Sequence, residues 1–313
     1  MVPRDWGTRR PSPRPPVKTL SGLAYIGHVR ILVTNDDGIQ ARGIHHLVRA
    51  LDAWCARDTE QHSIIVVAPQ SNCTGAGASV GEVYHRDTVS YQRYEIPGAE
   101  HIEAFGADAT PALCTFLGVL GGFGERPDLV LSGINIGVNV GRSLLHSGTV
   151  GAALTASQLG LSAMAVSIQA VKRAPYDTAA AVAIALLDDL IQAPLRSVFN
   201  VNVPALAIED LKGIRQGRIS NAGIIKSADE PTNAHQRLGM GETGEVRLHL
   251  GTSIPELGDV SDERPDDDGA LIAAGYASVS AVRTISESTE QGVDELLGDG
   301  IKRAAAKLNL PAT

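Results

Sequence analysis

The sequence predicts an α/β protein with a Rossmann-like, doubly wound and mostly parallel sheet. Short apolar runs without polar alternation, such as residues 29–34 and 63–68, are typical of strands that helices cover on both faces. Segments with apolar residues at helical spacing separate these runs. The runs end in Asp, Asn, Ser or Gly, and open α/β sheets carry their functional groups at such strand ends.

The N-terminal part of this pattern is a βαβ unit. Residues 29–34 form the first buried strand, and residues 43–57 carry apolar side chains at helical spacing. The β-branched run from Ile64 to Val67 predicts the second strand, which ends at Pro69. A pair of antiparallel strands is expected within residues 89–105.

The next helix begins at Thr110 and Pro111, because Thr is a favoured N-cap and Pro fits the first helical position. Strands and helices then alternate, as a doubly wound sheet requires. The expected elements are a strand at 128–133, a helix at 149–158, a strand at 163–167, a helix at 176–191 and a strand at 198–203.

Beyond Pro204 the periodicity weakens, and the sequence predicts only short strands. These are expected at 213–219, 246–250 and 277–282. The acidic stretch at 259–268 is interpreted as a mostly solvated loop. A helix from about residue 293 to 308 is expected to close the chain.

The composition indicates a soluble globular protein of 313 residues, with 43% hydrophobic and 20% charged residues. A formal net charge of -8 argues against binding to a nucleic-acid duplex, which depends on clustered Lys and Arg. No apolar run reaches the roughly 18 to 20 residues that span a membrane. The three cysteines form no CxxC pair, so a reducing compartment and a cytoplasmic location are expected.

Asp36 and Asp37 stand directly after the first strand, in the run TNDDG. Adjacent carboxylates repel each other unless a cation lies between them, which favours a divalent metal site. The alternative is an ordinary strand-to-helix turn, in which Asn, Asp and Gly are also favoured.

Two further loops at predicted strand ends offer neutral oxygen donors. Asn72 and Thr74 follow the second strand, and Asn135 and Asn139 lie in SGINIGVNVG at residues 132–141. Mg²⁺ and Mn²⁺ prefer such oxygen ligands together with one or two carboxylates.

Residues 147–153, SGTVGAA, lead into a predicted helix. Exposed N–H groups at a helix N-terminus, beside Ser and Thr hydroxyls, form a natural anion site. Ser147, Gly148 and Thr149 are therefore candidates for binding phosphate. The alternative is a plain N-cap at Ser147 or Thr149.

Four ordered blocks, NDDG, VVAP with its polar loop, SGINIGVNVG and SGTVGAA, together resemble the SurE family of survival-protein nucleotidases. The resemblance continues through YDTAA, NVNVP, KGIR and GYASV, and covers about residues 29 to 283. Each block alone is modest, but their number and order are specific.

The resemblance implies a metal-dependent phosphomonoesterase that hydrolyses nucleoside 5′- and 3′-monophosphates to nucleoside and phosphate. It implies one divalent ion per subunit, Mg²⁺ or Mn²⁺, and a homodimer or homotetramer that exchanges a C-terminal β-hairpin. The implied domains are an extension at 1–28, interpreted as disordered, an α/β domain at 29–285 and a C-terminal helix within 286–313. The core is expected at about 29–204, with the hairpin and oligomerisation region at about 205–285.

Carried onto this sequence, the family pattern implies three overlapping sets of site residues. The metal ligands are Asp36, Asp37, Thr74, which takes the place of a serine, and Asn135. The catalytic residues are Asp36, Asp37 and Asn72. The residues that bind the phosphorylated substrate are Asn35, Gly75, Asn139, Ser147, Gly148 and Thr149.

The sequence also departs from the family pattern. Gln70 stands where an acid is usual, Ser71 and Cys73 where basic residues are usual, and the GTPxDC block has Ala109 and Leu113 in place of its Gly and Asp. These departures leave two alternatives open. The chain could be a phosphatase for a non-nucleotide phosphorylated metabolite, or a catalytically weakened nucleotide-binding protein.

Overall fold

A computed structural model describes most of the region from residue 27 to residue 284. The described residues are 27–57, 62–81, 83–85, 87–221, 226–227, 250–251 and 264–284, together with two short strands at 18–20 and 23–25. No helix in this described part is both long and apolar enough to span a membrane.

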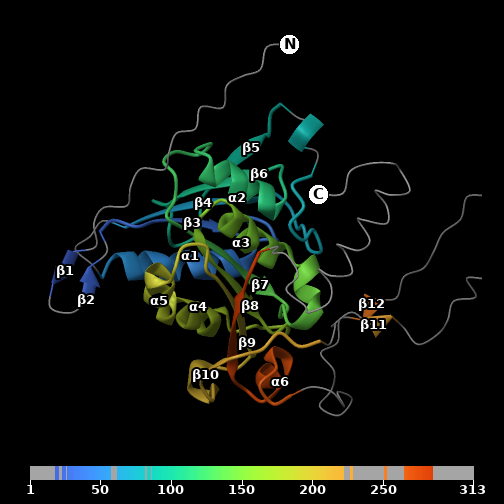
Figure 1. Ribbon diagram of the computed structural model, residues 1–313. Helices are drawn as coiled ribbons and strands as arrows, with labels where there is room; N and C mark the ends of the chain where they lie inside the picture. The colour runs from blue at the N-terminus through green and yellow to red at the C-terminus, as the bar shows by residue number, and fades with distance from the viewer. Residues whose placement is uncertain are drawn as a thin grey trace, which may run out of the picture. The chain divides into compact units, whose positions relative to one another are not determined.

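A nine-stranded mixed sheet forms the centre of the fold, in the order β10-β13-β9-β8-β7-β3-β4-β6-β5 (Figure 1). Six neighbouring strands run parallel, from β9 across to β6. They are β3 (Arg30–Thr34), β4 (Ser63–Pro69), β6 (Glu103–Ala107), β7 (Leu129–Ile136), β8 (Ser162–Ile168) and β9 (Val198–Val203). The predicted fold class is confirmed.

Antiparallel pairing occurs towards the two ends of the sheet. β5 (Tyr91–Tyr94) pairs with β6, and β13 (Ala277–Val282) pairs with β9, in both cases antiparallel. β10 (Ile214–Gln216) then pairs in parallel with β13. The strand expected at 213–219 is thus present but shorter.

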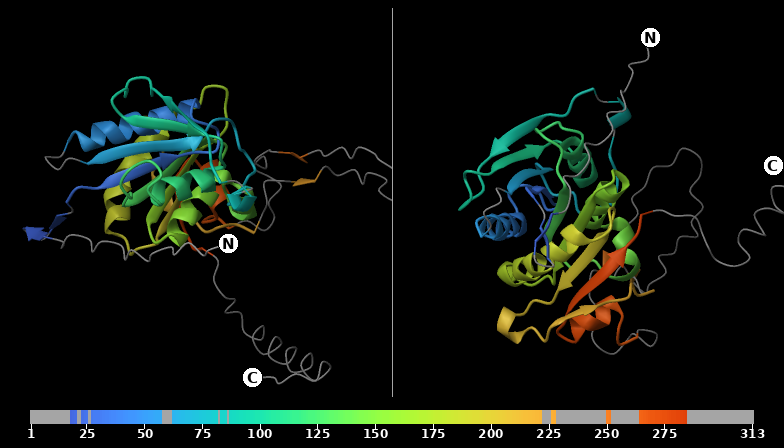
Figure 2. Two further views of the ribbon diagram at one scale, coloured as in Figure 1. Left: turned by 90° about the horizontal axis from the view of Figure 1, so that it is seen from above. Right: turned by 60° about the vertical axis from the view of Figure 1, so that its left-hand side comes forward.

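Helices cover both faces of the sheet (Figure 2). α1 (Arg42–Cys55), α4 (Tyr176–Ala185) and α5 (Leu187–Gln192) pack on one face, and α2 (Pro111–Val119) and α3 (Gly148–Gln158) pack on the other. In β3, Ile31 and Val33 join the core under the first group, while Leu32 joins the core under the second. Alternate side chains of one strand are therefore buried on opposite faces, which explains its unbroken apolar sequence.

Two local features differ from the predictions. The helix expected at 176–191 is divided at Leu186 into α4 and α5. A short helix, α6 (Asp268–Ala273), begins inside the acidic stretch that was interpreted as a solvated loop.

The solvated-loop interpretation is wrong for Asp267 and Asp268, which are both buried. Asp267 accepts a hydrogen bond from the N–H of Arg264, and Asp268 accepts bonds from the N–H groups of Gly141 and Ser220. Backbone donors replace water around these carboxylates, so their charge does not require exposure.

Several predictions concern residues at or beyond the edges of the described structure. β11 (Lys226–Ser227) and β12 (Leu250–Gly251) pair antiparallel, and β12 contains the last residue of the strand expected at 246–250. β1 (Lys18–Leu20) and β2 (Leu23–Tyr25) pair antiparallel within the N-terminal extension. Residues 1–17, 228–249 and 285–313 lie outside the described residues, and the expected C-terminal helix with them.

The N-terminus of α1 packs directly on the backbone at the end of β7. A Cβ atom added to Gly43 would lie 1.8 Å from the carbonyl oxygen of Ile134. Only glycine permits this approach. The contact sets the position of α1 beside Asn135, one of the predicted metal ligands.

We predict that Gly43→Ala destabilises the protein. Helix propensity alone would favour alanine by up to about 1 kcal/mol. The overlap with Ile134 outweighs this gain, and overpacking of this kind costs about 1–3 kcal/mol. Urea denaturation measures the change, and Ala53→Gly, at an exposed position of the same helix, reports the propensity effect alone. A more stable Gly43→Ala protein would contradict the close packing.

Candidate active site

The three predicted loops meet at one edge of the sheet. They follow β3, β4 and β7, which are neighbours in the order β7-β3-β4 and run parallel. Their carboxyl ends therefore lie at the same edge, where α/β proteins place ligand sites.

Asp36 is buried, with 2% of its surface exposed, and the first turn of α3 holds its carboxylate. The hydroxyl of Thr149 donates to Oδ1 at 2.6 Å, and the N–H of Thr149 donates to Oδ2 at 3.2 Å. Burial raises the pKa of Asp36, and the bonds from Thr149 oppose this rise. Gly148 allows α3 to pack this closely against Asp36, since a Cβ atom at residue 148 would lie 2.8 Å from the Cβ of Asp36.

The first turn of α3 therefore contacts a carboxylate of the protein itself. Ser147 is the N-cap, because its hydroxyl accepts a hydrogen bond from the N–H of Val150 at 3.1 Å. This is the plain capping role that the sequence left open for Ser147. Phosphate binding by Ser147, Gly148 and Thr149 stays a prediction.

Asp37 and Asn135 lie together through the end of β7. Oδ2 of Asp37 accepts a hydrogen bond from the N–H of Ile136, the residue after Asn135, at 3.2 Å. Burial, and then the negative charge of Asp36, raises the pKa of Asp37 to about 6. The side-chain amide of Asn135 donates to the carbonyl of Gly137, so its Oδ1 is the atom left for ligation.

The loop after β4 reaches Asp36 through its backbone. The N–H of Cys73 donates to the carbonyl of Asp36 at 2.6 Å. Thr74 and Asn72 are exposed, and the N–H of Thr74 donates to Oδ1 of Asn72 at 2.8 Å. Gly75 adopts a φ of +85° beside open space. The loop is therefore next to the aspartates, and metal ligation by Thr74 stays a prediction.

Two predicted substrate-binding residues have internal hydrogen-bond partners. Asn35 donates from its amide to the carbonyl of Gly38 at 2.8 Å. Asn139 donates from its side chain to Ser167 at 2.8 Å, and its N–H donates to Oδ1 of Asn202 at 2.7 Å. These bonds tie the loop after β7 to β8 and β9, so Asn139 has a structural role whether or not it contacts substrate.

The donor set fits a hard divalent cation. Within the described ranges, neither Asp36 nor Asp37 forms an ion pair with Lys or Arg. The same ranges contain no metal-binding cluster of three or more His, Cys, Asp or Glu side chains, and the candidate set here consists of two Asp side chains and the amide of Asn135. Asp36, Asp37 and Asn135 offer oxygen atoms, which Mg²⁺ and Mn²⁺ prefer to nitrogen and sulfur. Two partly desolvated carboxylates side by side are stabilised by a cation.

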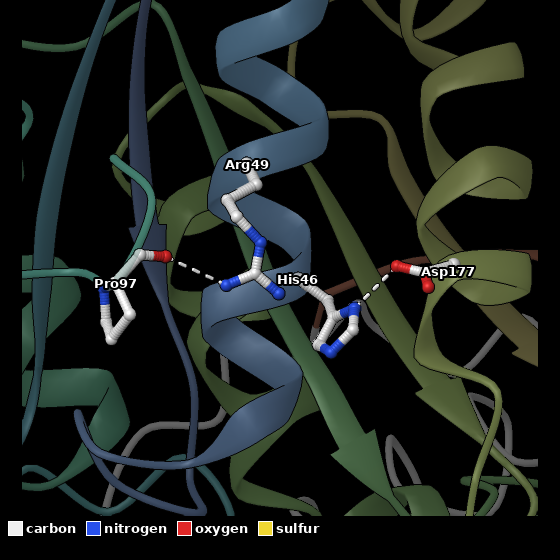
Figure 3. Close-up of polar contacts among 4 residues, drawn as sticks. All are labelled: His46, Arg49, Pro97 and Asp177. Carbon is white, nitrogen blue, oxygen red and sulfur yellow. Dashed lines mark hydrogen bonds and ion pairs between the residues drawn. The ribbon is translucent and has the colours of Figure 1, made fainter. Parts of the chain in front are cut away.

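On the side of Asp37, α1 and α4 are joined by contacts that the sequence did not indicate. His46 on α1 stacks on Tyr176 at 5.4 Å between ring centroids, and its Nδ1 lies 2.5 Å from Asp177 on α4. Figure 3 shows the contact between His46 and Asp177. Beside it, Arg49 donates a hydrogen bond to the carbonyl of Pro97 at 2.9 Å. A Cβ atom added to Gly43 would lie 3.2 Å from Cε1 of Tyr176 and 1.8 Å from the carbonyl oxygen of Ile134, so this ring lies near the end of β7. Burial, and then the charge of Asp37, raises the pKa of Tyr176. No local pattern links residues 37, 46 and 176.

A cavity of about 230 Å³ is lined by Cys73, whose N–H donates to the carbonyl of Asp36. The loop after β4 and the start of α2 form part of its wall. Its lining includes five of the six positions at which the sequence departs from the family pattern, namely Gln70, Ser71, Cys73, Ala109 and Leu113. The sixth, Thr74, does not line it. Departures that are separated in the sequence are therefore gathered in one place.

Comparison with known proteins agrees with this fold and site. Residues 31–225 match the family described as Survival protein SurE. A 5′/3′-nucleotidase SurE of Cronobacter sakazakii is 37% identical over 257 residues, which cover 80% of this chain and 89% of that protein. One from Klebsiella pneumoniae is 34% identical and covers 88% of this chain and 97% of that protein. The crystal structure of a SurE protein from Aquifex aeolicus has a TM-score of 0.63 at 24% identity, covering 88% of this chain and 99% of that chain.

We predict that Asp37 makes the metal-free protein less stable as the pH rises. The folded protein raises the pKa of this carboxyl from its ordinary value of 3.8 to about 6, so the folded state binds more protons than the unfolded state across this window. The unfolding free energy contributed by Asp37 therefore falls between these values. Asp37→Asn should be more stable than wild type at about pH 8 and should lose this advantage at about pH 4.

Urea denaturation with a chelator present measures both proteins at the two pH values. Asp189→Asn, at an exposed position of α5, is the control and should show no such pH-dependent difference. Equal destabilisation of Asp37→Asn at both pH values would contradict the assigned burial.

Proposed function

Because this chain belongs to the SurE family, we propose that it is a 5′/3′-nucleotidase, a phosphomonoesterase that converts nucleoside monophosphates to nucleoside and phosphate. The observation that carries the proposal is the pair formed by the buried Asp36 and the half-buried Asp37 at the end of β3, held by α3 and β7. A water oxygen forms a bond to phosphorus, the ester P–O bond breaks, and the departing oxygen receives a proton.

We propose that one divalent ion per subunit, Mg²⁺ or Mn²⁺, is held by Asp36, Asp37, Thr74 and Asn135. When bound, such an ion offsets the charge of the phosphate and makes a water molecule more acidic. The raised pKa values of both aspartates support this assignment, because partly desolvated carboxylates gain most from a cation.

The hydrogen bonds suggest different roles for the two aspartates. Both oxygens of Asp36 accept bonds from Thr149, so this carboxylate is fixed in orientation. Asp37 accepts the one bond from Ile136 with Oδ2, which leaves Oδ1 to orient water or receive its proton. Asn72, on the neighbouring loop, is proposed to assist at the same site.

Substrate binding is proposed for Asn35, Gly75, Asn139, Ser147, Gly148 and Thr149. The support for the last three is the N-terminus of α3, whose partial positive charge faces the site and favours anions. Thr149 also has a positioning role, since it contacts the carboxylate of Asp36.

A second candidate is a phosphatase for a non-nucleotide phosphorylated metabolite. The cavity lined by Cys73 favours it, because five of the six departures from the family pattern line that cavity. Phosphate release from a panel of nucleoside monophosphates and sugar phosphates, with and without Mn²⁺ or Mg²⁺, separates the two candidates. Metal and nucleotide binding without any phosphate release would instead support a weakened, nucleotide-binding protein.

We further propose a homodimer or homotetramer assembled through the region from about 205 to 285. The antiparallel pairing of β11 with β12 supports a hairpin there. A cytoplasmic location is proposed from the cysteines Cys55, Cys73 and Cys114, which are free thiols.

Asp36→Asn should lower metal-dependent phosphate release by about a hundredfold or more, because one ligand charge is lost at the reacting phosphate. Initial rates at saturating Mn²⁺ measure this change. Asp189→Asn removes an exposed carboxylate elsewhere and should leave the rate unchanged. Wild-type activity in Asp36→Asn would show that the metal site is assigned wrongly.

Thr149→Val should weaken metal binding roughly 10- to 100-fold, because groups that orient a metal ligand have effects of this size. Thr149→Ser keeps the hydroxyl that donates to Asp36 and should restore most of the affinity. The Mn²⁺ concentration for half-maximal activity and direct Mn²⁺ binding both report the effect. Unchanged metal affinity in Thr149→Val would contradict the proposal that Thr149 positions Asp36 for the metal.

A further inference from the structure

The connection between β7 and α3 begins beside one of the proposed metal ligands, Asn135. The side-chain amide of Asn135 donates to the carbonyl of Gly137, the first residue of this connection after β7. The 3₁₀ helix η2 (Gly141–His146) then leads into α3. The orientation of Asn135 therefore depends on how residues 137–141, the β7–α3 loop, are held.

Asp268, the first residue of α6, holds the far end of this loop. Its side chain is fully buried, and its Oδ2 accepts a hydrogen bond from the N–H of Gly141 at 2.9 Å. Its Oδ1 accepts from the N–H of Ser220 at 3.2 Å and from the N–H of Gly269 at 2.9 Å. One carboxylate thus joins the loop to a segment that lies 127 residues further along the chain.

A second contact joins α6 to the same loop. Ile272 forms a small buried cluster with Val138 and Val140. Because Asp268 and Ile272 are four residues apart, they lie on one face of α6. That face contacts the β7–α3 loop through both a hydrogen bond and an apolar cluster.

The middle of the loop is held separately, by the sheet. The carbonyl of Asn139 accepts hydrogen bonds from the side-chain amides of Asn200 and Asn202 in β9, each at 2.9 Å. These bonds do not reach Gly141, which is buried and whose N–H donates to Asp268. Since a buried N–H needs a partner, loss of the Asp268 acceptor would favour a different position of the loop end.

We propose that Asp268 is a positioning residue of the phosphatase, which fixes the β7–α3 loop and thereby holds Asn135 in the orientation that ligates the metal. A carboxylate suits this role because both of its oxygens accept from backbone N–H groups, whereas a primary amide has one oxygen. The inference rests on the proposed function, because it concerns a ligand of the proposed metal site. It extends that site to α6, which supplies none of the proposed ligands.

Asp268→Asn tests the proposal, and Asp267→Asn is its matched control. The amide keeps the size of the side chain, but its nitrogen is a donor and cannot accept from a backbone N–H. Asp267 is also buried, and it accepts a hydrogen bond from the N–H of Arg264, which is outside the loop, at 2.9 Å. Both variants remove a buried carboxylate at the start of α6, and within the described residues only Asp268→Asn removes a bond to the loop.

Mn²⁺ affinity, measured by calorimetry without substrate, should be about tenfold weaker in Asp268→Asn, the order of effect of groups that orient a metal ligand. The value of kcat/KM for adenosine 5′-monophosphate should fall about 10- to 100-fold, because small displacements at a reacting centre have effects of this order. Asp267→Asn should change neither value, even where urea denaturation shows a similar loss of stability. Equal losses in both variants, or unchanged values in a folded Asp268→Asn protein, would overturn the proposal.

An Asn135→Ala background shows whether Asp268 acts through Asn135. In that background, Asp268→Asn should weaken Mn²⁺ binding little further, because the ligand that it positions is already gone. An equal further loss in both backgrounds would overturn the assigned route. If Asn135→Ala itself binds Mn²⁺ as wild type does, the proposed metal site is wrong, and the positioning role is lost with it.

Ile272→Ala gives a second test if Asp268→Asn does not fold, because it shortens the apolar contact with Val138 and Val140. It should also weaken Mn²⁺ binding. Leu271→Ala, a buried change at the neighbouring position of α6 and outside this cluster, should leave Mn²⁺ binding unchanged. Unchanged Mn²⁺ affinity in a folded Ile272→Ala protein would show that α6 does not position the loop.

Discussion

The proximity of two partly desolvated carboxylates, Asp36 and Asp37, is the constraint on which the site depends. Burial raises both pKa values, and the charge of Asp36 raises that of Asp37 further. The protein offsets part of this cost with donors from Thr149 and Ile136. The remaining cost is largest when both groups are charged and no cation is present, which is the condition that a divalent metal relieves.

The rest of the fold brings those donors to the pair. Parallel strands β7, β3 and β4 end at the same edge, and their crossover helices return the chain on both faces of the sheet. Gly43 and Gly148 allow α1 and α3 to approach the loops so closely that any side chain there would overlap neighbouring atoms. Helix packing and site geometry are therefore linked through two residues that have no side chain.

The aspartate pair and the cavity lined by Cys73 differ in chemistry. Asp37 and Asn135 offer oxygen donors suited to a cation, whereas the cavity wall combines apolar side chains with the polar groups of Gln70, Ser71, Asp108 and Thr110. A phosphomonoester has the same division, with a charged phosphate and a leaving group of variable polarity. Five of the six departures from the family pattern line the cavity, and the sixth, Thr74, is one of the proposed metal ligands.

The sequence by itself determined the order of strands and helices in the core, the burial of the strands on both faces and the position of the aspartates at a strand end. These features follow from local periodicity and turn chemistry. Only the tertiary structure decided that Thr149 contacts Asp36 across 113 residues, that Asp268 is buried, and that residues 70–73 and 109–113 form one cavity wall. The physical reason is that each of these features depends on how distant segments pack together, and no local pattern encodes the distance between segments that meet after folding.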